Sequence, residues 1–336
     1  MLTLHSSTHH DDHALHQLQV LSKILKAGGD PLRLEILRVL EKDSFGVLEL
    51  CQIFQIKQSG MSHHLKVLAQ AGLVASRKEG NSVFYFRPEL QQEGLPSPLT
   101  GALFSCLDES PIRAEIAHAM KDAFARRAEV SQKFFSENAS HAAEQQDLIA
   151  GLNVYGTHVE QFLAHQLAKQ NQTRFAHTLE IGPGNGEFLP VLSHLSEHVV
   201  ALDNNKEMLQ LAENVAQKQG LTNVSFALDD TRFCQNHRPL FHCAVINMVL
   251  HHTPSPQCIF EDVSQCLASG GVLVIADLCQ HDQDWTRTTC GDMWLGFAPE
   301  SLTQWALTSG LEEGHSKYFA LRNGFQIQIR EFIKPH

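Results

Sequence analysis

Three glycines spaced two residues apart, Gly182, Gly184 and Gly186, follow the apolar segment 177–181 and precede a helix-like segment. Glycine permits positive φ in a tight turn and lets the backbone approach a ligand closely. The spacing is not that of the dinucleotide fingerprint G-x-G-x-x-G, because the third glycine comes one residue early. Glu180 stands just before the turn. A glycine turn that opens with a carboxylate suits a ligand that carries an ammonium group and no pyrophosphate.

A second acidic residue, Asp203, ends the next apolar segment, 198–202. A carboxylate at the end of this second strand suits a pair of ribose hydroxyls. Glycines, Glu180 and Asp203 occur together in a strand-helix-strand context, which favours a ligand-binding turn over a glycine-rich turn without a ligand.

The C-terminal part of the chain alternates predicted strands and helices. Strands are expected at 177–181, 198–202, 223–228, 241–247 and 271–277, helices at 186–194, 205–219 and 257–267, and an antiparallel hairpin around 322–332. This alternation predicts a parallel sheet with helices on both faces and a ligand beyond the carboxyl ends of the strands. The expected ligand-binding residues are Tyr155, Glu180, Gly182, Gly184, Gly186, Asp203, Asn204, Asp230, Thr231, Asn247 and Met248. Asp229 is the alternative to Asp230, since the register there is open by one residue.

Two further segments, 249–256 and 277–282, should lie at the same carboxyl ends of the strands. Together they carry His251, His252, Asp277, Cys279 and His281. Such residues can act as acids and bases, border a methyl acceptor, or bind a metal. No ligand spacing is recognisable, so no metal site is expected, and residues that shape the pocket are the favoured interpretation. His251 and Asp277 are the catalytic candidates if there is chemistry.

The N-terminal part is predominantly helical. Helices are expected from Leu18, over 32–40 with Asp30 as N-cap and Pro31 in its first turn, over 47–54 and over 58–68. A hairpin over 74–86, with its tip at 79–81, follows the last of these. Helices, a helix-turn-helix and a β-hairpin in this order predict a winged helix, which places the second helix of the pair in the major groove of DNA.

The second helix of that pair and the hairpin offer polar and basic side chains to DNA. The expected DNA-binding residues are Gln58, Ser59, Ser62, His63, Lys66, Arg77 and Lys78. Residues 57–87 contain five Lys and Arg against Glu79 alone, a local positive charge inside an otherwise neutral domain. A winged helix used only for protein contacts is the less favoured alternative.

Four parts of the chain are expected: a His-rich arm at 1–17, the winged helix at 18–95, a linker and long helix at 96–149, and the ligand-binding domain at 150–336. The arm is interpreted as solvated rather than metal-binding. In the third part, Ser110 and Pro111 are expected to begin a helix that carries an apolar stripe from Ile112 to Phe124. This stripe could form a dimer seam or pack on the C-terminal domain, and the sequence leaves both open.

Composition excludes several classes of protein. The net charge is −11 and resides in residues 96–336, because residues 1–95 hold ten basic and ten acidic residues. An acidic C-terminal part argues against broad nucleic-acid binding there. The eight cysteines form no C-x-C or C-x-x-C pair, which fits reduced thiols in a cytoplasmic protein. We expect no secretory signal and no membrane span.

Both parts resemble known families. Segments 30–37 and 61–68 resemble ArsR/SmtB-type repressors, although Gly46 and Leu48 stand where many members of that family have the cysteines of a metal site. The glycine turn and Asp203 resemble class I S-adenosylmethionine-dependent methyltransferases. The resemblance implies a two-domain chain with an N-terminal winged helix-turn-helix (α+β), a helical linker, and a C-terminal α/β Rossmann-like methyltransferase fold.

The whole chain is most similar to regulators of methionine metabolism that respond to S-adenosylhomocysteine, on the basis of segments 247–252, 277–281 and 290–297. This resemblance implies a homodimer that binds a double-stranded DNA operator and senses S-adenosylhomocysteine or S-adenosylmethionine. The alternative is an active methyltransferase that is regulated by its winged helix.

Overall fold

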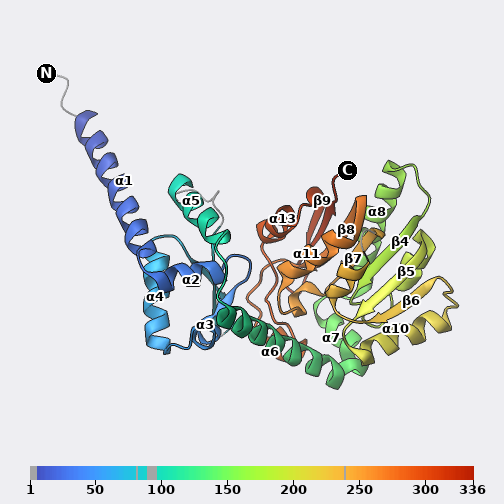
Figure 1. Ribbon diagram of the computed structural model, residues 1–336. Helices are drawn as coiled ribbons and strands as arrows, with labels where there is room; N and C mark the ends of the chain where they lie inside the picture. The colour runs from blue at the N-terminus through green and yellow to red at the C-terminus, as the bar shows by residue number, and fades with distance from the viewer. Residues whose placement is uncertain (1–5, 81, 89–96, 238–239) are drawn as a thin grey trace. The chain divides into compact units, whose positions relative to one another are not determined.

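A computed structural model of the chain describes residues 6–80, 82–88, 97–237 and 240–336, with the backbone alone for residues 6–14 and 97. The chain folds into two compact units, residues 1–124 and 125–336 (Figure 1). The segment that the sequence suggested as a separate part, 96–149, is divided between them. In the part of the chain that the structure covers, no helix is both long and apolar enough to span a membrane.

The first unit is a winged helix. Its elements are α1 (Ser6–Gly28), α2 (Pro31–Val39), β1 (Phe45–Gly46), α3 (Val47–Phe54), α4 (Gln58–Gln70), β2 (Ala75–Glu79), β3 (Ser82–Phe86), α5 (Ser97–Asp108) and the first part of α6 (Ala114–Asn138). The three strands form one sheet in the order β1-β3-β2, and both pairings are antiparallel. The predicted helix-turn-helix is α3 and α4, and the predicted hairpin is β2 and β3; its tip residue Asn81 lies outside the described residues.

Local signals explain where these helices begin. The Asp30 carboxylate accepts the backbone N–H of Arg33 at 3.0 Å, and Pro31 occupies the first turn of α2, as predicted. In α4 the apolar positions Met61, Leu65 and Leu68 are all buried, which leaves the rest of that helix for solvent or a partner.

Two expectations for the first unit need correction. Helix α1 begins at Ser6 rather than near Leu18, so the expected arm at 1–17 overlaps it; residues 1–5 and the side chains up to residue 14 lie outside the description. Residue 96, the first of the expected linker segment, lies outside the described residues. Ser110 does not begin the long helix, because its hydroxyl donates to the Cys106 carbonyl and closes α5, and α6 begins only at Ala114.

The apolar stripe of α6 packs into the core of the winged helix itself. Ile116 is buried, Ile112, Met120 and Phe124 are packed against the same core, and the Phe124 ring lies 5.4 Å from that of Phe45. This stripe therefore packs on the core of its own unit, a partner that neither of the two expected interpretations named. Helix α5, which the sequence analysis missed, packs there as well through Phe104 and Leu107.

The second unit contains a seven-stranded sheet. Its strands are β4 (Phe175–Ile181), β5 (Ser196–Asp203), β6 (Val224–Leu228), β7 (Phe241–Asn247), β8 (Leu267–Leu278), β9 (Glu312–Ala320) and β10 (Gln326–Ile333). They lie in the order β6-β5-β4-β7-β8-β10-β9. The first five are parallel, and β10 runs antiparallel between β8 and β9. This confirms the predicted strands and places the expected hairpin at one edge of the sheet.

Helices cover both faces of this sheet (Figure 1). The helices of this unit are the last part of α6, α7 (Ala142–Ile149), α8 (Leu152–Lys169), α9 (Leu189–Leu195), α10 (Lys206–Lys218), α11 (Pro256–Cys266), α12 (Trp285–Thr289) and α13 (Pro299–Thr308), with short 3-10 turns at Ala139–His141, Thr231–Asn236 and Leu250–His252. Side chains of α8, α9 and α10 share one core with alternate residues of the central strands. On β10 Phe332 faces the other way and packs on Phe260 of α11.

Candidate functional site

The order of the strands brings the predicted ligand-binding residues together at the carboxyl ends of the parallel strands. The chain leaves β4 toward β5 and β6 on one side and then returns to β7 and β8 on the other. At such a switch point the loops after neighbouring strands diverge and leave a crevice at the carboxyl ends. Glu180, Asp203 and Asn247 stand at or next to the carboxyl ends of β4, β5 and β7.

The glycine turn after β4 adopts backbone conformations that favour glycine. Gly182, Gly184 and Gly186 have φ values of +66°, +58° and +81°. A Cβ at Gly182 would lie 2.5 Å from the side chain of Val249, so this position also needs a small residue for packing. A Cβ at Gly184 would meet no atom within 4 Å. The middle of the turn therefore faces open space, as a turn that contacts a ligand requires.

Glu180 is a buried carboxylate next to this turn. Its side chain is 2% exposed, and Oε2 has no hydrogen-bond partner in the part of the chain that is described. Burial raises the pKa of Glu180 to about 8. Tyr155 of α8 is also buried, and burial together with the nearby carboxylate of Glu180 raises the pKa of its hydroxyl. A positively charged ligand group at this place would compensate the buried carboxylate.

The loop after β7 carries a second set of unpaired polar atoms. Both the oxygen and the nitrogen of the buried Asn247 side-chain amide lack a hydrogen-bond partner among the described residues. Met248 has a φ of +55°, which is rare for a residue with a side chain. Strained backbone of this kind concentrates at ligand sites. Asn247 and Met248 thus lie at the carboxyl end of β7, and the unpaired amide atoms are those of Asn247.

Asp203 ends β5 and is held by the loop that follows it. Its Oδ1 accepts the backbone N–H of Asn205 at 2.8 Å. Burial raises the pKa of Asp203 to about 6, although hydrogen bonds from the backbone of Asn205 and Asn204 act in the opposite direction. The remaining acceptor sites of this carboxylate are those that would receive two ribose hydroxyls.

Helix α6 contributes to the same site. The Gln132 side-chain amide donates to the Asn204 carbonyl at 3.2 Å, and the Asn205 side-chain amide donates to Ser136 Oγ at 3.0 Å. A pocket here is lined by Ala128, Gln132, Asn204, Leu228, Asp229 and Asp230. Two of its walls thus come from the ends of β5 and β6, and the third comes from α6.

The expected ligand-binding residues after β6 are only partly in this pocket. Asp229 and Asp230 both line it, which leaves the one-residue choice between them open. The carboxylate of Asp230 pairs with Arg232 at 2.6 Å, and this hydrogen bond lowers the pKa of Asp230. The Thr231 hydroxyl donates to Asp262 of α11 at 2.6 Å, so it is turned toward that helix.

The histidines after β7 join carboxylates from two later segments. His251 Nδ1 lies 2.7 Å from Asp277 Oδ1, and both side chains are fully buried. Burial lowers the pKa of His251, but the carboxylates of Asp277 and Asp292 raise it more, to about 8. Burial and the neighbouring His251 lower the pKa of His252 to about 3. The structure thus brings together the two catalytic candidates and adds Asp292, which the sequence analysis did not single out.

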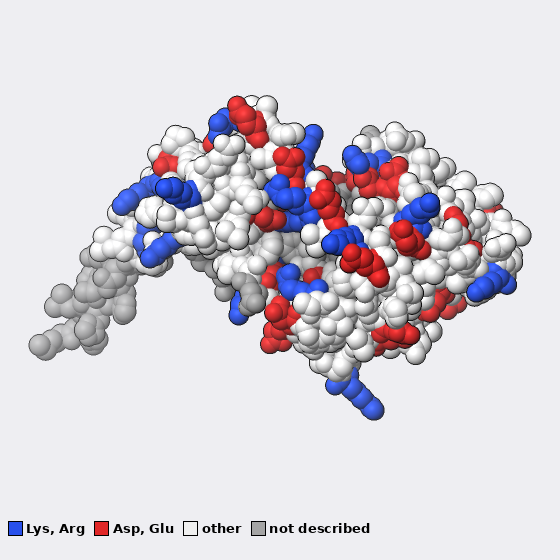
Figure 2. Space-filling view, turned by 90° about the horizontal axis from the view of Figure 1, so that it is seen from below, with Lys and Arg blue, Asp and Glu red and all other residues white. Residues whose placement is uncertain are grey.

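On the winged helix, the predicted DNA-binding residues of α4 share the surface of that helix. Gln58, Ser59, Ser62, His63 and Lys66 are all exposed. The hairpin differs: Lys78 is exposed, but Arg77 pairs with the buried carboxylate of Glu79 at 2.9 Å. Arg87 likewise pairs with Asp108 at 2.6 Å. These pairs reduce the local positive charge, and basic and acidic side chains lie interspersed over much of the face in Figure 2.

Comparisons with known proteins agree with this division. A family described as a helix-turn-helix domain matches residues 29–77, and one described as a methyltransferase domain matches residues 173–309. The N-terminal part is 44% identical over 66 residues to an uncharacterized HTH-type transcriptional regulator of Methanocaldococcus jannaschii, covering 19% of this chain and 74% of that protein. The chain belongs to the helix-turn-helix transcriptional regulators. Its helix-turn-helix domain is ArsR-type and is fused to a methyltransferase domain.

Two further relatives match one domain each. An arsenical resistance operon repressor of Staphylococcus xylosus is 45% identical over 65 residues, which are 19% of this regulator and 62% of the repressor. A ubiquinone biosynthesis O-methyltransferase of Coxiella burnetii is 23% identical over 167 residues, which are 45% of this regulator and 71% of the enzyme. The two predicted resemblances are therefore confirmed at the level of the domains.

Sequence reasoning missed the residues that α6 brings to the pocket. Ala128 and Gln132 stand four residues apart, as do Gln132 and Ser136, so the three lie on one face of the helix. Small and polar residues at this spacing, after the apolar stripe has ended, were the signal in the sequence. Asp292 gave no comparable signal, because it lies far along the chain from both histidines.

Proposed function

We propose that this regulator senses S-adenosylhomocysteine or S-adenosylmethionine through its methyltransferase domain and changes its affinity for a DNA operator in response. In this proposal the regulated genes are those of methionine and methyl-group metabolism. The regulator works inside the cytoplasm, where operator and ligand are both present.

The observation that carries the proposal is the double role of α6. Its first part packs Ile116 and Phe124 into the core of the winged helix, and its last part carries Ala128 and Gln132 into the pocket wall. One continuous helix is thus a structural element of both the winged helix and the proposed ligand site. In the proposal, a ligand that favours one position of α6 changes the winged helix through the same helix. Allosteric coupling requires such an element, whose equilibrium is shared by the two sites.

Each proposed contact follows from the chemistry of one end of the ligand. The buried carboxylate of Glu180 would receive the ammonium of the methionine or homocysteine moiety, with Tyr155 and Asn247 beside it. Gly184 would allow the ligand to approach the turn, and Asp203 would accept the ribose hydroxyls. The adenine would lie toward Asp229, Asp230 and α6. These contacts are common to S-adenosylmethionine and S-adenosylhomocysteine, so they do not select one of the two.

On the DNA side, we propose that α4 enters the major groove and that Gln58, Ser59, Ser62 and His63 contact base edges. Lys66 and Lys78 would contact phosphates. Arg77 would hold the hairpin through Glu79 and contribute less to DNA than its charge suggests, because the ion pair with Glu79 already engages it.

A palindromic operator would require a dimer, which is part of the proposal. The stripe of α6 packs against the core of its own domain, with Ile116 buried and Ile112, Met120 and Phe124 partly buried. Helix α1, in contrast, exposes Leu15, Leu18 and Leu25, with exposed fractions of 56%, 63% and 63%. Because residues three and seven apart fall on one side of a helix, these leucines form an apolar face that a second copy could cover.

The experiment that tests the proposal combines calorimetric titration of both ligands with operator gel shifts. A sensor binds at least one of the ligands and changes operator affinity with no methyl acceptor present. If neither ligand bound, or if ligand binding left operator affinity unchanged, the proposal would be wrong.

An active methyltransferase is the second candidate function. The buried pair of His251 and Asp277, with the pKa of His251 near 8, is the observation that favours it. An enzyme would consume S-adenosylmethionine when it is offered an extract of candidate acceptors, and His251→Gln would abolish that consumption. A pure sensor would leave the cofactor intact.

A further inference from the structure

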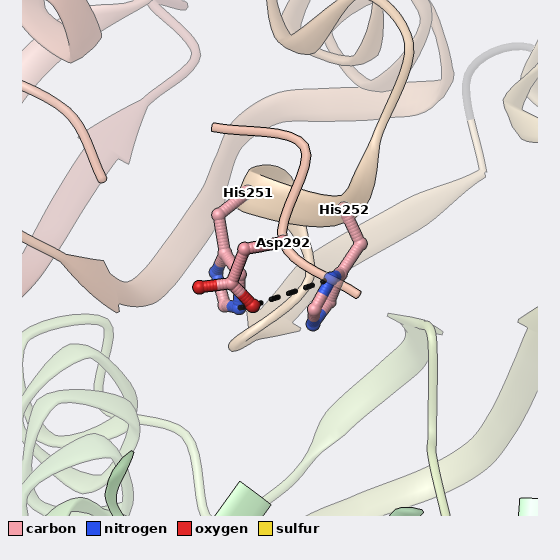
Figure 3. A group of neighbouring side chains, drawn as sticks. All are labelled: His251, His252 and Asp292. Carbon is pink, nitrogen blue, oxygen red and sulfur yellow. Dashed lines mark ion pairs between the residues drawn. The ribbon is translucent and has the colours of Figure 1, made fainter. Parts of the chain in front are cut away.

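Three side chains that can bind a metal converge at the rim of the sheet, beside the site described above. His251 and His252 belong to the turn Leu250–His252, and Asp292 comes from the loop after α12 (Figure 3). One potential ligand atom of each residue lies within 4.8 Å of the other two. Asp292 Oδ1 is 3.9 Å from His251 Nε2 and 3.9 Å from His252 Nδ1.

Two members of this group are buried without the partners that such groups need. Asp292 is 3% exposed and His251 is fully buried. Neither carboxylate oxygen of Asp292 accepts a hydrogen bond from any described residue, and His251 Nε2 also has no hydrogen-bond partner there. Burying a charged carboxylate without donors is costly. A cation that binds between the three side chains would take His251 Nε2 and one carboxylate oxygen of Asp292 as ligands and would neutralise that carboxylate.

The surrounding structure fixes the orientation of the His251 imidazole. The carboxylate of Asp277 accepts the backbone N–H groups of Leu250 and Leu278 and lies 2.7 Å from His251 Nδ1. This arrangement leaves Nε2 of His251 as its metal-facing atom. A carboxylate behind a histidine is the usual second layer of a metal site, because it sets the tautomer and strengthens the ligand.

The other two ligands are also held in place. The ring of Phe135 meets that of His252 edge to face, with centroids 4.9 Å apart. The backbone N–H groups of Met293 and Trp294 donate to the His251 carbonyl at 2.9 and 3.0 Å. These two hydrogen bonds connect the loop of Asp292 directly to the turn that carries the histidines. The three side chains therefore form a built group rather than a chance approach of mobile side chains.

The spacing suits a small divalent ion. Zinc binds nitrogen and oxygen at about 2.0–2.2 Å, and two ligand atoms at tetrahedral angles around it are then roughly 3.4 Å apart. The observed separations of 3.9 Å are slightly wider and far longer than a hydrogen bond. All three ligand atoms lie within 4.8 Å of one another, and His252 Nδ1 also lies 3.2 Å from the Gly291 carbonyl. The side chains would therefore move closer together to close the group around an ion, and His252 would give up that contact if Nδ1 is the ligand.

We propose that His251, His252 and Asp292 bind one divalent ion of the zinc type, with His251 Nε2, one ring nitrogen of His252 and one carboxylate oxygen of Asp292 as its ligands. Three protein ligands leave a fourth position open for water or for a donor atom of a small molecule. Two imidazoles and one carboxylate select zinc, cobalt or nickel over the hard ions magnesium and calcium. The charge balance agrees, because a divalent ion neutralises the two buried carboxylates of Asp277 and Asp292.

An arrangement without metal makes the opposite prediction. A protonated His251 between Asp277 and Asp292 would supply one positive charge to two carboxylates, and added metal would then find no site. The two arrangements differ in metal stoichiometry and in the spectrum of bound cobalt, which absorbs strongly in the visible range when four-coordinate and weakly when six-coordinate.

The test is titration of the full chain with Co²⁺ and, separately, with Zn²⁺, after treatment with a chelator. Asp292→Asn and His252→Gln are the site variants. His242→Gln is the matched control, because His242 lies near the start of β7 and stacks near His177 of β4, whereas the proposed ligands follow the other end of β7. The histidines of residues 1–16 are present in every variant, so the difference between variants counts the proposed site alone.

We expect the wild type and His242→Gln to bind one more Co²⁺ per chain than either site variant, with strong visible absorption. Asp277→Asn should keep the stoichiometry and weaken the affinity about 10–100-fold, as removal of a second-layer partner does. If Asp292→Asn failed to fold, the cobalt spectrum of the wild type and the His252→Gln variant would still decide. Equal stoichiometry in wild type and site variants, or only weak absorption from the wild type, would overturn the proposal.

Discussion

The side-chain amide of Asn205 donates to the backbone carbonyl of Gln132 at 3.2 Å and to Ser136 Oγ at 3.0 Å. Asn205 also caps α10, because its side-chain oxygen accepts the backbone N–H of Met208 at 3.0 Å. One buried residue therefore ties the loop after Asp203 to α6. A ligand that binds Asp203 and reorganises this loop would act on α6 through these hydrogen bonds.

Ser136→Ala should weaken the coupling between ligand and operator while leaving each binding event nearly intact. The change removes the hydrogen bond from Asn205 and one from Ser136 to Glu207 at 3.0 Å. A hydrogen bond contributes about 0.5–1.5 kcal/mol, so the ligand-induced change in operator affinity should fall roughly 2–10-fold. The measurement is operator binding with and without saturating ligand.

Ser269→Ala is the control for that variant, because the Ser269 hydroxyl also makes an exposed hydrogen bond, at 3.1 Å to Pro335, at the other end of the sheet. Its coupling should equal that of the wild type. Full coupling in Ser136→Ala would mean that the Asn205 contacts do not transmit the signal.

Asp203→Ala should weaken binding of the S-adenosyl ligand and leave operator binding without ligand unchanged. Hydrogen bonds to a charged group contribute about 1.5–3 kcal/mol each, so the loss of one or two corresponds to about one to three orders of magnitude in Kd. Calorimetric titration measures this loss. Unchanged ligand affinity would show that the ribose does not lie at Asp203.

The lysine on α4 gives a prediction about salt. Lys66→Gln should weaken binding to all DNA sequences and reduce the slope of log K against log salt by about 0.9 per protomer, as expected for one lost phosphate contact. Lys218→Gln, on the exposed side of α10, is the matched control and should leave the slope unchanged. Arg77→Gln should destabilise the hairpin, because it leaves the buried Glu79 without this ion pair, and change the salt slope less than Lys66→Gln does. A larger change in slope for Arg77→Gln would reverse this assignment.

Elements with strong local signals could be predicted from the sequence. Asp30 and Pro31 mark the start of α2, and the spacing of Met61, Leu65 and Leu68 defines the buried side of α4. The glycine turn and Asp203 were found in the same way, since each follows directly from one apolar strand. The fold of both domains followed from such signals, because each depends on residues that are close in the sequence.

Relationships between distant segments could not be predicted. The stripe of α6 indicated burial but did not indicate that its partner is the core of the winged helix around Phe45. Asp292 meets His251 only because the loop after α12 is bonded to the turn after β7. The pairing of Arg77 with Glu79 is different: the two residues are neighbours on one side of β2, so strand periodicity contained the information.

Glu180 gives a prediction about pH. Its pKa in the folded protein is about 8, above its value in the unfolded chain, because burial disfavours the charged form. The folded domain then binds more protons than the unfolded chain between about pH 4.5 and 8. The free energy of unfolding without ligand should therefore be highest below this range, fall as the pH rises through it, and change little through this group above pH 8.

Glu180→Gln keeps the shape of the side chain and removes its charge, so it should reduce that pH dependence and stabilise the ligand-free domain at pH 8. It should also weaken ligand binding about 10–100-fold, because a charged hydrogen bond to the ammonium is lost. All three tryptophans, Trp285, Trp294 and Trp305, lie in the second unit, so urea unfolding followed by tryptophan fluorescence measures this domain alone. A variant with the same pH dependence as the wild type would show that Glu180 is not the titrating group. A variant that gained stability but kept full ligand affinity would place the ammonium elsewhere.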